Sequence, residues 1–235
     1  MGYYTSMILL IPAMILSVVA SSRVQSAFKS FSQVADIRGL TGAQAARMML
    51  DANGLGDVQI NQIQGTLTDN YNPKTKTLNL STSVCNVNSI SAISVACHEA
   101  GHALQHAFGY APLRIRNNIV PIVSFASRVS WILIMVGIML LASGSYQYGV
   151  IGDTIFNIGV LAFVAVVVFH LITLPIELDA SNRALNQMEA LNIVTGTEEA
   201  AGAKKVLSAA ALTYIAALVF SVANLLRVLA IRGRR

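Results

Sequence analysis

Four long apolar runs constrain the fold of this chain more than any other feature of its sequence. They cover residues 3–22, 117–143, 150–174 and 209–231. A helix of about 20 apolar residues is long enough to cross a bilayer. Only 11% of the residues are charged, against about 25% in an average soluble protein. The sequence therefore predicts a mainly α-helical membrane protein with about four transmembrane or membrane-associated helices.

The polar residues in and around these runs define the expected spans. No Lys or Arg precedes the run at residues 3–22, so we interpret it as a retained anchor helix rather than a signal peptide. Arg128 interrupts the second run, and a charge at the bilayer centre costs at least about 3 kcal/mol. We therefore expect that span at about residues 129–148. The next span is expected at about residues 150–174, and a C-terminal apolar helix at residues 206–231.

The segment between the first two spans, residues 23–118, is expected to lie in water. Thr41 and Gln44 have capping-box spacing, which predicts a short helix over residues 41–53. Apolar residues and turn-forming residues then predict a small β element, with strands at 57–64 and 75–81 and a turn at 70–74.

An HExxH motif occupies residues 98–102, within a helix expected at residues 89–108. His98 and His102 are one helical turn apart, so both project from one face and can hold one metal ion. Glu99 is placed to act as the base for a metal-bound water, as in zinc peptidases. Gly101 weakens a helix interior by about 1 kcal/mol relative to alanine, which predicts a close approach of backbone or substrate to this face.

A catalytic zinc site usually has three protein ligands and a water, so a third ligand is required. Glu177 is preferred, because it follows the third span directly, where a carboxylate is costly unless a cation compensates it. Asp179 is the alternative ligand, or it orients a ligand histidine through the ring nitrogen that faces away from the metal. His106, eight residues after His98, lies too far along a straight helix to close a tetrahedron and is a weaker candidate. His170 lies inside the third span on nearly the same face as Glu177 and is a candidate donor to the oxyanion.

The distribution of basic residues predicts the orientation in the membrane. Eight Lys or Arg lie between residues 23 and 118, and none lies in the loop at 143–149. The positive-inside rule places the motif segment in the cytoplasm and Met1 outside. Two spans later the chain returns to the cytoplasmic side by about Pro175, so Glu177 can reach the metal. If the C-terminal helix crosses the membrane, its basic tail lies outside, which is against the same rule. A surface-lying or re-entrant helix therefore stays an alternative.

Three segments of the chain resemble a known family, the YugP-type neutral zinc metallopeptidases of bacterial membranes. They are residues 70–73 (NYNP), 98–106 (HEAGHALQH) and 174–181 (LPIELDAS). The wider relatives of that family are gluzincin-type membrane peptidases, which include the CAAX prenyl proteases and the bacterial heat-shock membrane protease. The resemblance implies a gluzincin-like HExxH helix, a Zn²⁺ cofactor and an active site that faces the cytoplasm.

Carried over to this sequence, the resemblance makes His98 and His102 metal ligands, Glu99 the catalytic base and Glu177 the third ligand. One position departs from the pattern of the wider group. That group has an aspartate four residues after its ligand glutamate, whereas this chain has Ser181. Asp179 is the nearest residue that can substitute for it.

Together these observations predict a zinc-dependent endopeptidase of the bacterial inner membrane, which hydrolyses peptide bonds with a zinc-activated water at the cytoplasmic surface. We expect a single domain over residues 1–235, with the third-ligand segment at 175–205. The expected partners are a protein or peptide substrate, which pairs with the strand at 77–80, and the lipid bilayer. The basic residues are spread along the chain, so nucleic acid is not an expected partner. The alternatives are an intramembrane site-two-type protease, with the motif inside a span, and a non-enzymatic metal-binding scaffold or transporter.

Overall fold

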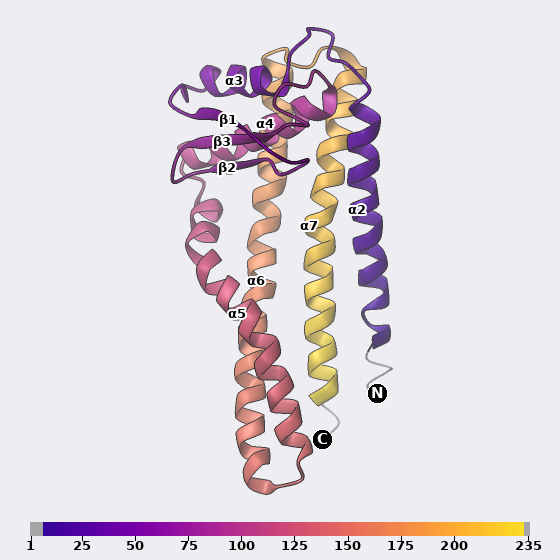
Figure 1. Cartoon of the computed structure of the whole chain (residues 1–235), viewed down its shortest axis with the longest axis vertical. Helices are drawn as coiled ribbons and strands as arrows, with labels where there is room; N and C mark the ends of the chain where they lie inside the picture. The colour runs from indigo at the N-terminus through magenta and orange to yellow at the C-terminus, as the bar shows by residue number, and fades with distance from the viewer. Residues whose placement is uncertain (1–6, 233–235) are drawn as a thin grey trace. The chain divides into compact units, whose positions relative to one another are not determined.

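The computed structural model describes residues 7–232, and these residues are mainly helical. They form the helices and strands labelled in Figure 1, namely α2 (Ile11–Phe31), α3 (Gly42–Ala52), β1 (Gln59–Ile63), β2 (Asn70–Asn72), β3 (Thr77–Ser81), α4 (Ile90–Ala107), α5 (Ala111–Ala142), α6 (Tyr146–Ala190) and α7 (Gly196–Arg232). Four of the helices, α2, α5, α6 and α7, are long and apolar enough to cross a membrane. The expected mainly helical fold with a small β element is confirmed. Residues 3–6 of the expected anchor helix lie outside the described residues.

Backbone contacts divide the chain into two compact units. Unit 1 contains residues 1–17, 115–174 and 215–235, and unit 2 contains residues 18–114 and 175–214. The long helices α2, α5, α6 and α7 contribute residues to both units. The single domain expected from the sequence stays a prediction.

Unit 2 contains the three-stranded sheet, α3 and α4 around one apolar core. The predicted capping box of α3 is present. The backbone N–H of Gln44 donates to Thr41 Oγ1 at 3.3 Å, and the backbone N–H of Thr41 donates to Gln44 Oε1 at 2.9 Å. Fully buried side chains such as Met49, Leu78 and Ile93 come from α3, β3 and α4. The core therefore fixes the sheet and α3 against the helix that carries the HExxH motif.

The sheet has the strand order β1-β3-β2, with β1 parallel and β2 antiparallel to β3. Two expectations from the sequence were wrong here. Residues 70–74 were expected to form a turn, but Asn70–Asn72 form the edge strand β2, and the turn starts only after Asn72, whose Oδ1 accepts the N–H of Lys74 at 3.0 Å. The strand at 77–80 was expected to pair with a substrate, but β3 is central and already paired on both sides.

Helix α4 is close to its expected bounds, with Ser89 as the N-cap, whose hydroxyl accepts the N–H of Ala92 at 3.2 Å. It is not among the four described helices that are long and apolar enough to cross a membrane. An intramembrane protease of the site-two type needs its motif inside a span, so this finding gives that alternative no support.

The long helices extend beyond the apolar runs from which they were predicted. Helix α5 begins at Ala111 and ends before Gly144, whose φ of +75° suits a residue that follows a helix end. The span expected at 129–148 therefore crosses the connection between α5 and α6. Helix α6 continues from the third span through Pro175 to Ala190, and α7 begins at Gly196 rather than at residue 206. The polar extensions stay helical because they are rich in residues that favour helices, such as alanine, leucine and glutamate.

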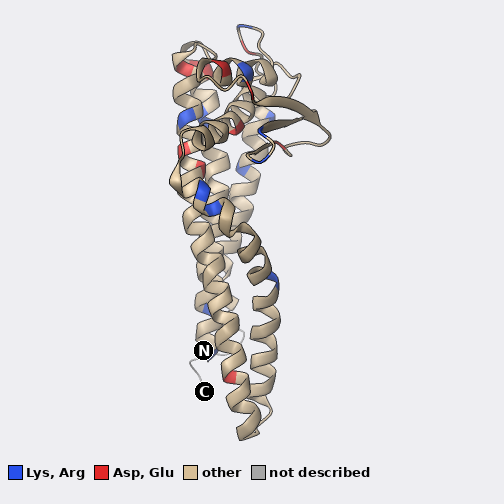
Figure 2. Cartoon of the chain, turned by 90° about the vertical axis from the view of Figure 1, so that its left-hand side faces the viewer, with Lys and Arg blue, Asp and Glu red and all other residues tan. Residues whose placement is uncertain are grey.

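Unit 1 packs α5, α6 and the end of α7 around a small core that includes Ile134, Phe156 and Val228. Helices α5 and α6 approach closely at Gly137, where a Cβ would lie 2.8 Å from the Cα of Phe156. Small residues of this kind let helices pack tightly in a membrane. Figure 2, which colours Lys and Arg blue and Asp and Glu red, shows few charged residues along the unit 1 parts of these helices. The charged residues that the structure describes in unit 1 are Arg116, Arg128, Asp153, Arg227 and Arg232.

Candidate metal centre

Three potential metal ligands converge in unit 2. His98 and His102 come from α4 and Glu177 comes from α6, and each offers a ligand atom within 4.8 Å of the others. Glu177 Oε2 lies 3.3 Å from His98 Nε2 and 3.4 Å from His102 Nε2. The sequence spaces the histidines one helical turn apart, and the packing of α4 against α6 brings the glutamate to both.

The carboxylate of Glu177 is almost fully buried, with 4% of its side chain exposed. A buried charge is costly unless it is paired. Burial lowers the pKa of His102, but the hydrogen bond with Glu177 and the charges of Glu99 and Glu177 raise it to about 9. The carboxylates therefore favour positive charge at this point, and a divalent cation supplies such charge while it displaces the proton from the histidine.

Gly101 allows the close contact between the two helices that carry the ligands. A Cβ at this position would lie 2.6 Å from the backbone oxygen of Ala180 in α6. The sequence predicted that a close approach of backbone or substrate explains this glycine, and the structure shows that the approaching group is backbone. Any larger residue must push α4 away from α6 next to the ligands.

The hydrogen bonds of Gln105 fix the orientation of His102. Its amide nitrogen donates to the backbone oxygen of Ile176 at 2.8 Å and to Asp179 Oδ2 at 2.8 Å. Its amide oxygen therefore faces His102 Nδ1, at 2.9 Å, and accepts a hydrogen bond from the N–H at that position. With the proton on Nδ1, the lone pair of neutral His102 lies on Nε2, toward Glu177. Sequence reasoning missed this role, although Gln105 lies three residues after His102 on the same face of the helix.

Asp179 does not belong to the group of potential ligands. Its Oδ2 accepts the amide of Gln105 and also the Nε of Arg183, at 2.6 Å. The sequence suggested that Asp179 is either a ligand or an orienting group for a histidine. In the structure Asp179 does not contact a histidine ligand directly. It holds Gln105, and Gln105 in turn orients His102.

Ser181 contacts the other histidine. Its Oγ lies 3.1 Å from His98 Nδ1, while His98 Nε2 faces Glu177. The hydroxyl can accept a hydrogen bond from Nδ1–H, which leaves the lone pair of Nε2 for a metal. The residue four positions after Glu177 therefore contacts a ligand histidine even though it is a serine rather than an aspartate.

Glu99 lies beside the ligands and is held by the sheet. The backbone N–H of Tyr71 in β2 donates to Glu99 Oε2 at 3.1 Å. Burial raises the pKa of Glu99, although the charges of His102 and His98 oppose this shift. Glu99 and His98 also line a cavity of about 300 Å³ whose walls include the apolar side chains of Phe28 from α2 and Leu207 from α7.

The remaining two histidines lie outside the group of potential ligands. His106 is exposed, and its Nδ1 lies 2.9 Å from the hydroxyl of Tyr71. His170 belongs to unit 1 and contacts the ring of Phe169, so its expected place at the site stays a prediction. Both cysteines are buried, and burial raises the pKa of the Cys97 thiol to about 12, which is consistent with a structural role.

The fold and the site together define a helical membrane protein with a site of two imidazoles and one carboxylate, a set that suits Zn²⁺. The chain belongs to the family described as "Putative neutral zinc metallopeptidase", which matches residues 6–233. It is 45% identical, over 219 residues, to the "Putative membrane protease YugP" of Bacillus subtilis (strain 168), and the match covers 93% of this chain and 92% of that protein. No solved structure matches the chain with significance. The resemblance drawn from the three sequence segments is confirmed.

Proposed function

We propose that this protein is a membrane-bound, zinc-dependent endopeptidase of the gluzincin type. His98, His102 and Glu177 hold the metal, and Glu99 is the catalytic base. The observation that carries this proposal is the convergence of the three side chains, which places both Nε2 atoms around one carboxylate oxygen. The family and the relative described above support the same activity.

A bound Zn²⁺ supplies a Lewis acid that activates a water and polarises a peptide carbonyl. The side chains of the protein orient the ligands and transfer the protons. Gln105 and Ser181 hold the ligand histidines with their Nε2 lone pairs toward the site. Glu99 takes the proton of the attacking water and delivers a proton to the leaving amine. The cavity beside Glu99 has apolar walls, which favours substrates with a large apolar side chain near the cleaved bond.

Metal removal tests this activity. The purified full-length protein should cleave an unstructured peptide that contains leucine and phenylalanine. A zinc chelator should abolish cleavage, because the three ligands then hold no Lewis acid, and Zn²⁺ added after removal of the chelator should restore it. Magnesium is the matched control and should not restore cleavage, since it prefers oxygen ligands. Cleavage that persists in chelator would contradict the proposal.

We further propose that the site faces the cytoplasm of a bacterium, at its inner membrane. The proposal rests on the eight Lys or Arg between residues 23 and 118 and on their absence from the loop at 143–149. Within unit 1, Arg232 at the end of α7 donates to Asp153 Oδ1, at 3.0 Å, near the start of α6. This pairing supports a crossing α7 that runs antiparallel to α6, because Asp153 offsets part of the basic charge that such a helix carries outward.

Labelling of single cysteines in intact cells tests the orientation. Both native cysteines are buried, and they are replaced by serine for this experiment. A cysteine at Ser145, in the connection between α5 and α6, should react with a membrane-impermeant reagent. A cysteine at Asn186, which is exposed on the cytoplasmic extension of α6, should react only after lysis. The reverse pattern would place the metal centre outside the cell.

A further inference from the structure

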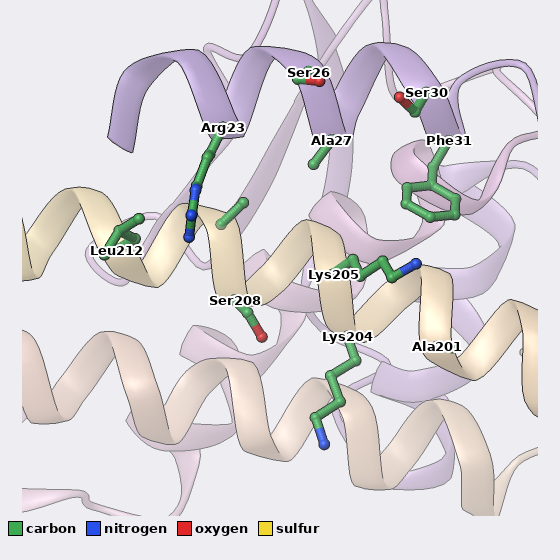
Figure 3. Close-up of a pocket in the computed structure, with 11 residues that line it drawn as sticks. Arg23, Ser26, Ala27, Ser30, Phe31, Ala201, Lys204, Lys205, Ser208 and Leu212 are labelled. Atoms are coloured by element: carbon green, nitrogen blue, oxygen red, sulfur yellow. The ribbon is translucent and has the colours of Figure 1, made fainter. Parts of the chain in front are cut away.

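Unit 2 contains a second cavity, which the proposed reaction does not use. It has a volume of about 710 Å³ and lies between α2 and α7. Figure 3 shows the residues that line it. From α2 they include Arg23, Ser26 and Ser30, and from α7 they include Lys204, Lys205 and Ser208. We propose that this groove binds the headgroup of an anionic phospholipid.

The residues that line the groove include three cationic and three hydroxyl side chains. None of its lining residues is acidic, and among the described residues none of the ion pairs involves Arg23, Lys204 or Lys205. Arg23 extends from α2 toward α7, and Lys205 extends along α7 toward Phe31, whereas Lys204 points away from α2 in this view (Figure 3). Arginine and lysine together with hydroxyl donors suit a phosphate group.

The position of these cations along the helices selects a lipid as the source of the phosphate. Arg23 directly follows the apolar run at residues 3–22, and Lys204 and Lys205 precede the apolar run that begins at Ala209. The apolar segments of both helices therefore end at the groove, which is the level at which basic residues meet lipid headgroups. Leu212 continues the lining of the groove into the apolar part of α7 and offers a surface to an acyl chain.

Close packing between α2 and α7 forms the end of the groove opposite Arg23. A Cβ at Gly202 would lie 2.8 Å from the ring of Phe31, so the two helices meet there. The ammonium group of Lys205 lies 5.9 Å from the centre of the same ring. Beyond this contact, Lys205 also lines a neighbouring cavity with Glu198 and Glu199. The Glu199 carboxylate accepts the backbone N–H groups of Ile37 and Thr195 at 2.9 and 2.6 Å. Among the described residues neither glutamate forms an ion pair with Lys205, so its ammonium group stays available to an anion in the groove.

The test measures lipid binding to the purified full-length chain by native mass spectrometry. The protein in neutral detergent is titrated with phosphatidylglycerol, with phosphatidylcholine or with inorganic phosphate. The test variant is R23Q/K205Q. The matched control is K29Q/K74Q, which loses the same two charges at residues that do not line the groove. The variant R23K/K205R keeps the charges, and size-exclusion elution and zinc content report on folding.

We expect phosphatidylglycerol to bind with a ratio of about one per chain and phosphatidylcholine to bind much more weakly. In R23Q/K205Q the half-saturating concentration of phosphatidylglycerol should rise about 25-fold, or about fivefold for each cation, which corresponds to about 1 kcal/mol for a basic residue near an anionic surface. The control should shift less than twofold, and R23K/K205R should bind like the wild type. If the double variant does not fold, Arg23→Gln and Lys205→Gln alone should each give the fivefold shift.

Three results would overturn the proposal. The first is an equal shift in the groove variant and the control, which attributes binding to net charge alone. The second is no shift in either variant. The third is saturable binding of inorganic phosphate that depends on Arg23 and Lys205 and is as tight as that of phosphatidylglycerol, because the ligand is then a soluble phosphate compound. None of these readouts depends on peptidase activity.

Discussion

Replacing Glu99 with glutamine is expected to lower the rate of peptide hydrolysis about 10³-fold while the zinc content stays unchanged, because proton transfer by a positioned group contributes roughly 10² to 10⁴ to a rate. Glutamine has the same shape, and its amide oxygen can still accept the N–H of Tyr71 that now bonds Glu99 at 3.1 Å. The side chain loses only its ability to take and return a proton. Steady-state cleavage of the peptide and zinc content, measured on the same preparation, check this result.

The matched control for this variant is Glu189→Gln, which removes an exposed carboxylate from α6. It should retain wild-type activity and zinc. If Glu99→Gln keeps its activity, Glu99 is not the base. A metal-binding scaffold or transporter gives a different result: the wild type and Glu99→Gln both bind zinc, and neither cleaves the peptide.

Replacing Gly101 with alanine should disable the site, although alanine favours a helix by about 1 kcal/mol relative to glycine. The added Cβ would lie 2.6 Å from the backbone oxygen of Ala180, and a backbone atom cannot move aside as a flexible side chain does. The helices must separate, which moves Glu177 away from His98 and His102. We expect activity to fall about 100-fold, since a displacement of about 1 Å at a reacting centre has that effect. Zinc affinity and thermal stability should fall with it.

Gly149→Ala is the control for the helix effect itself. Gly149 lies in α6 and a Cβ there meets no atom within 4 Å, so alanine should leave activity unchanged and stability unchanged or slightly higher. Thermal unfolding, zinc titration and peptide cleavage of both variants make the comparison. Wild-type zinc affinity and activity in Gly101→Ala would show that the contact between α4 and α6 does not determine the geometry of the metal centre.

The sequence predicted those parts of the site that depend on local spacing or on the order of the spans. His98 and His102 share a helix face because they are one turn apart. Glu177 reaches them because two spans separate the motif from its segment. The capping box of α3 is equally local, since Thr41 and Gln44 are three residues apart. Each of these features follows from helix geometry or from the length of an apolar run.

Features that depend on contacts between distant segments were not predictable in the same way. The role of Gln105 depends on the backbone oxygen of Ile176, 71 residues further along the chain. Strand β2 is too short for its side-chain pattern to distinguish it from a turn, and its pairing with β3 decides its conformation. Nothing in the apolar pattern alone indicates that α6 continues as helix beyond Pro175, because the packing of that extension against α4 stabilises it.

Zinc content per chain, measured in parallel on wild-type protein and on Glu177→Ala, tests the central claim most directly. Metal analysis of protein purified in the presence of Zn²⁺ should give about one zinc per wild-type chain and far less in the variant, because two histidines alone hold the ion weakly. Glu189→Ala, on an exposed face of the same helix, should match the wild type. Equal zinc in wild type and Glu177→Ala, or no zinc in the wild type, would contradict a centre made of His98, His102 and Glu177.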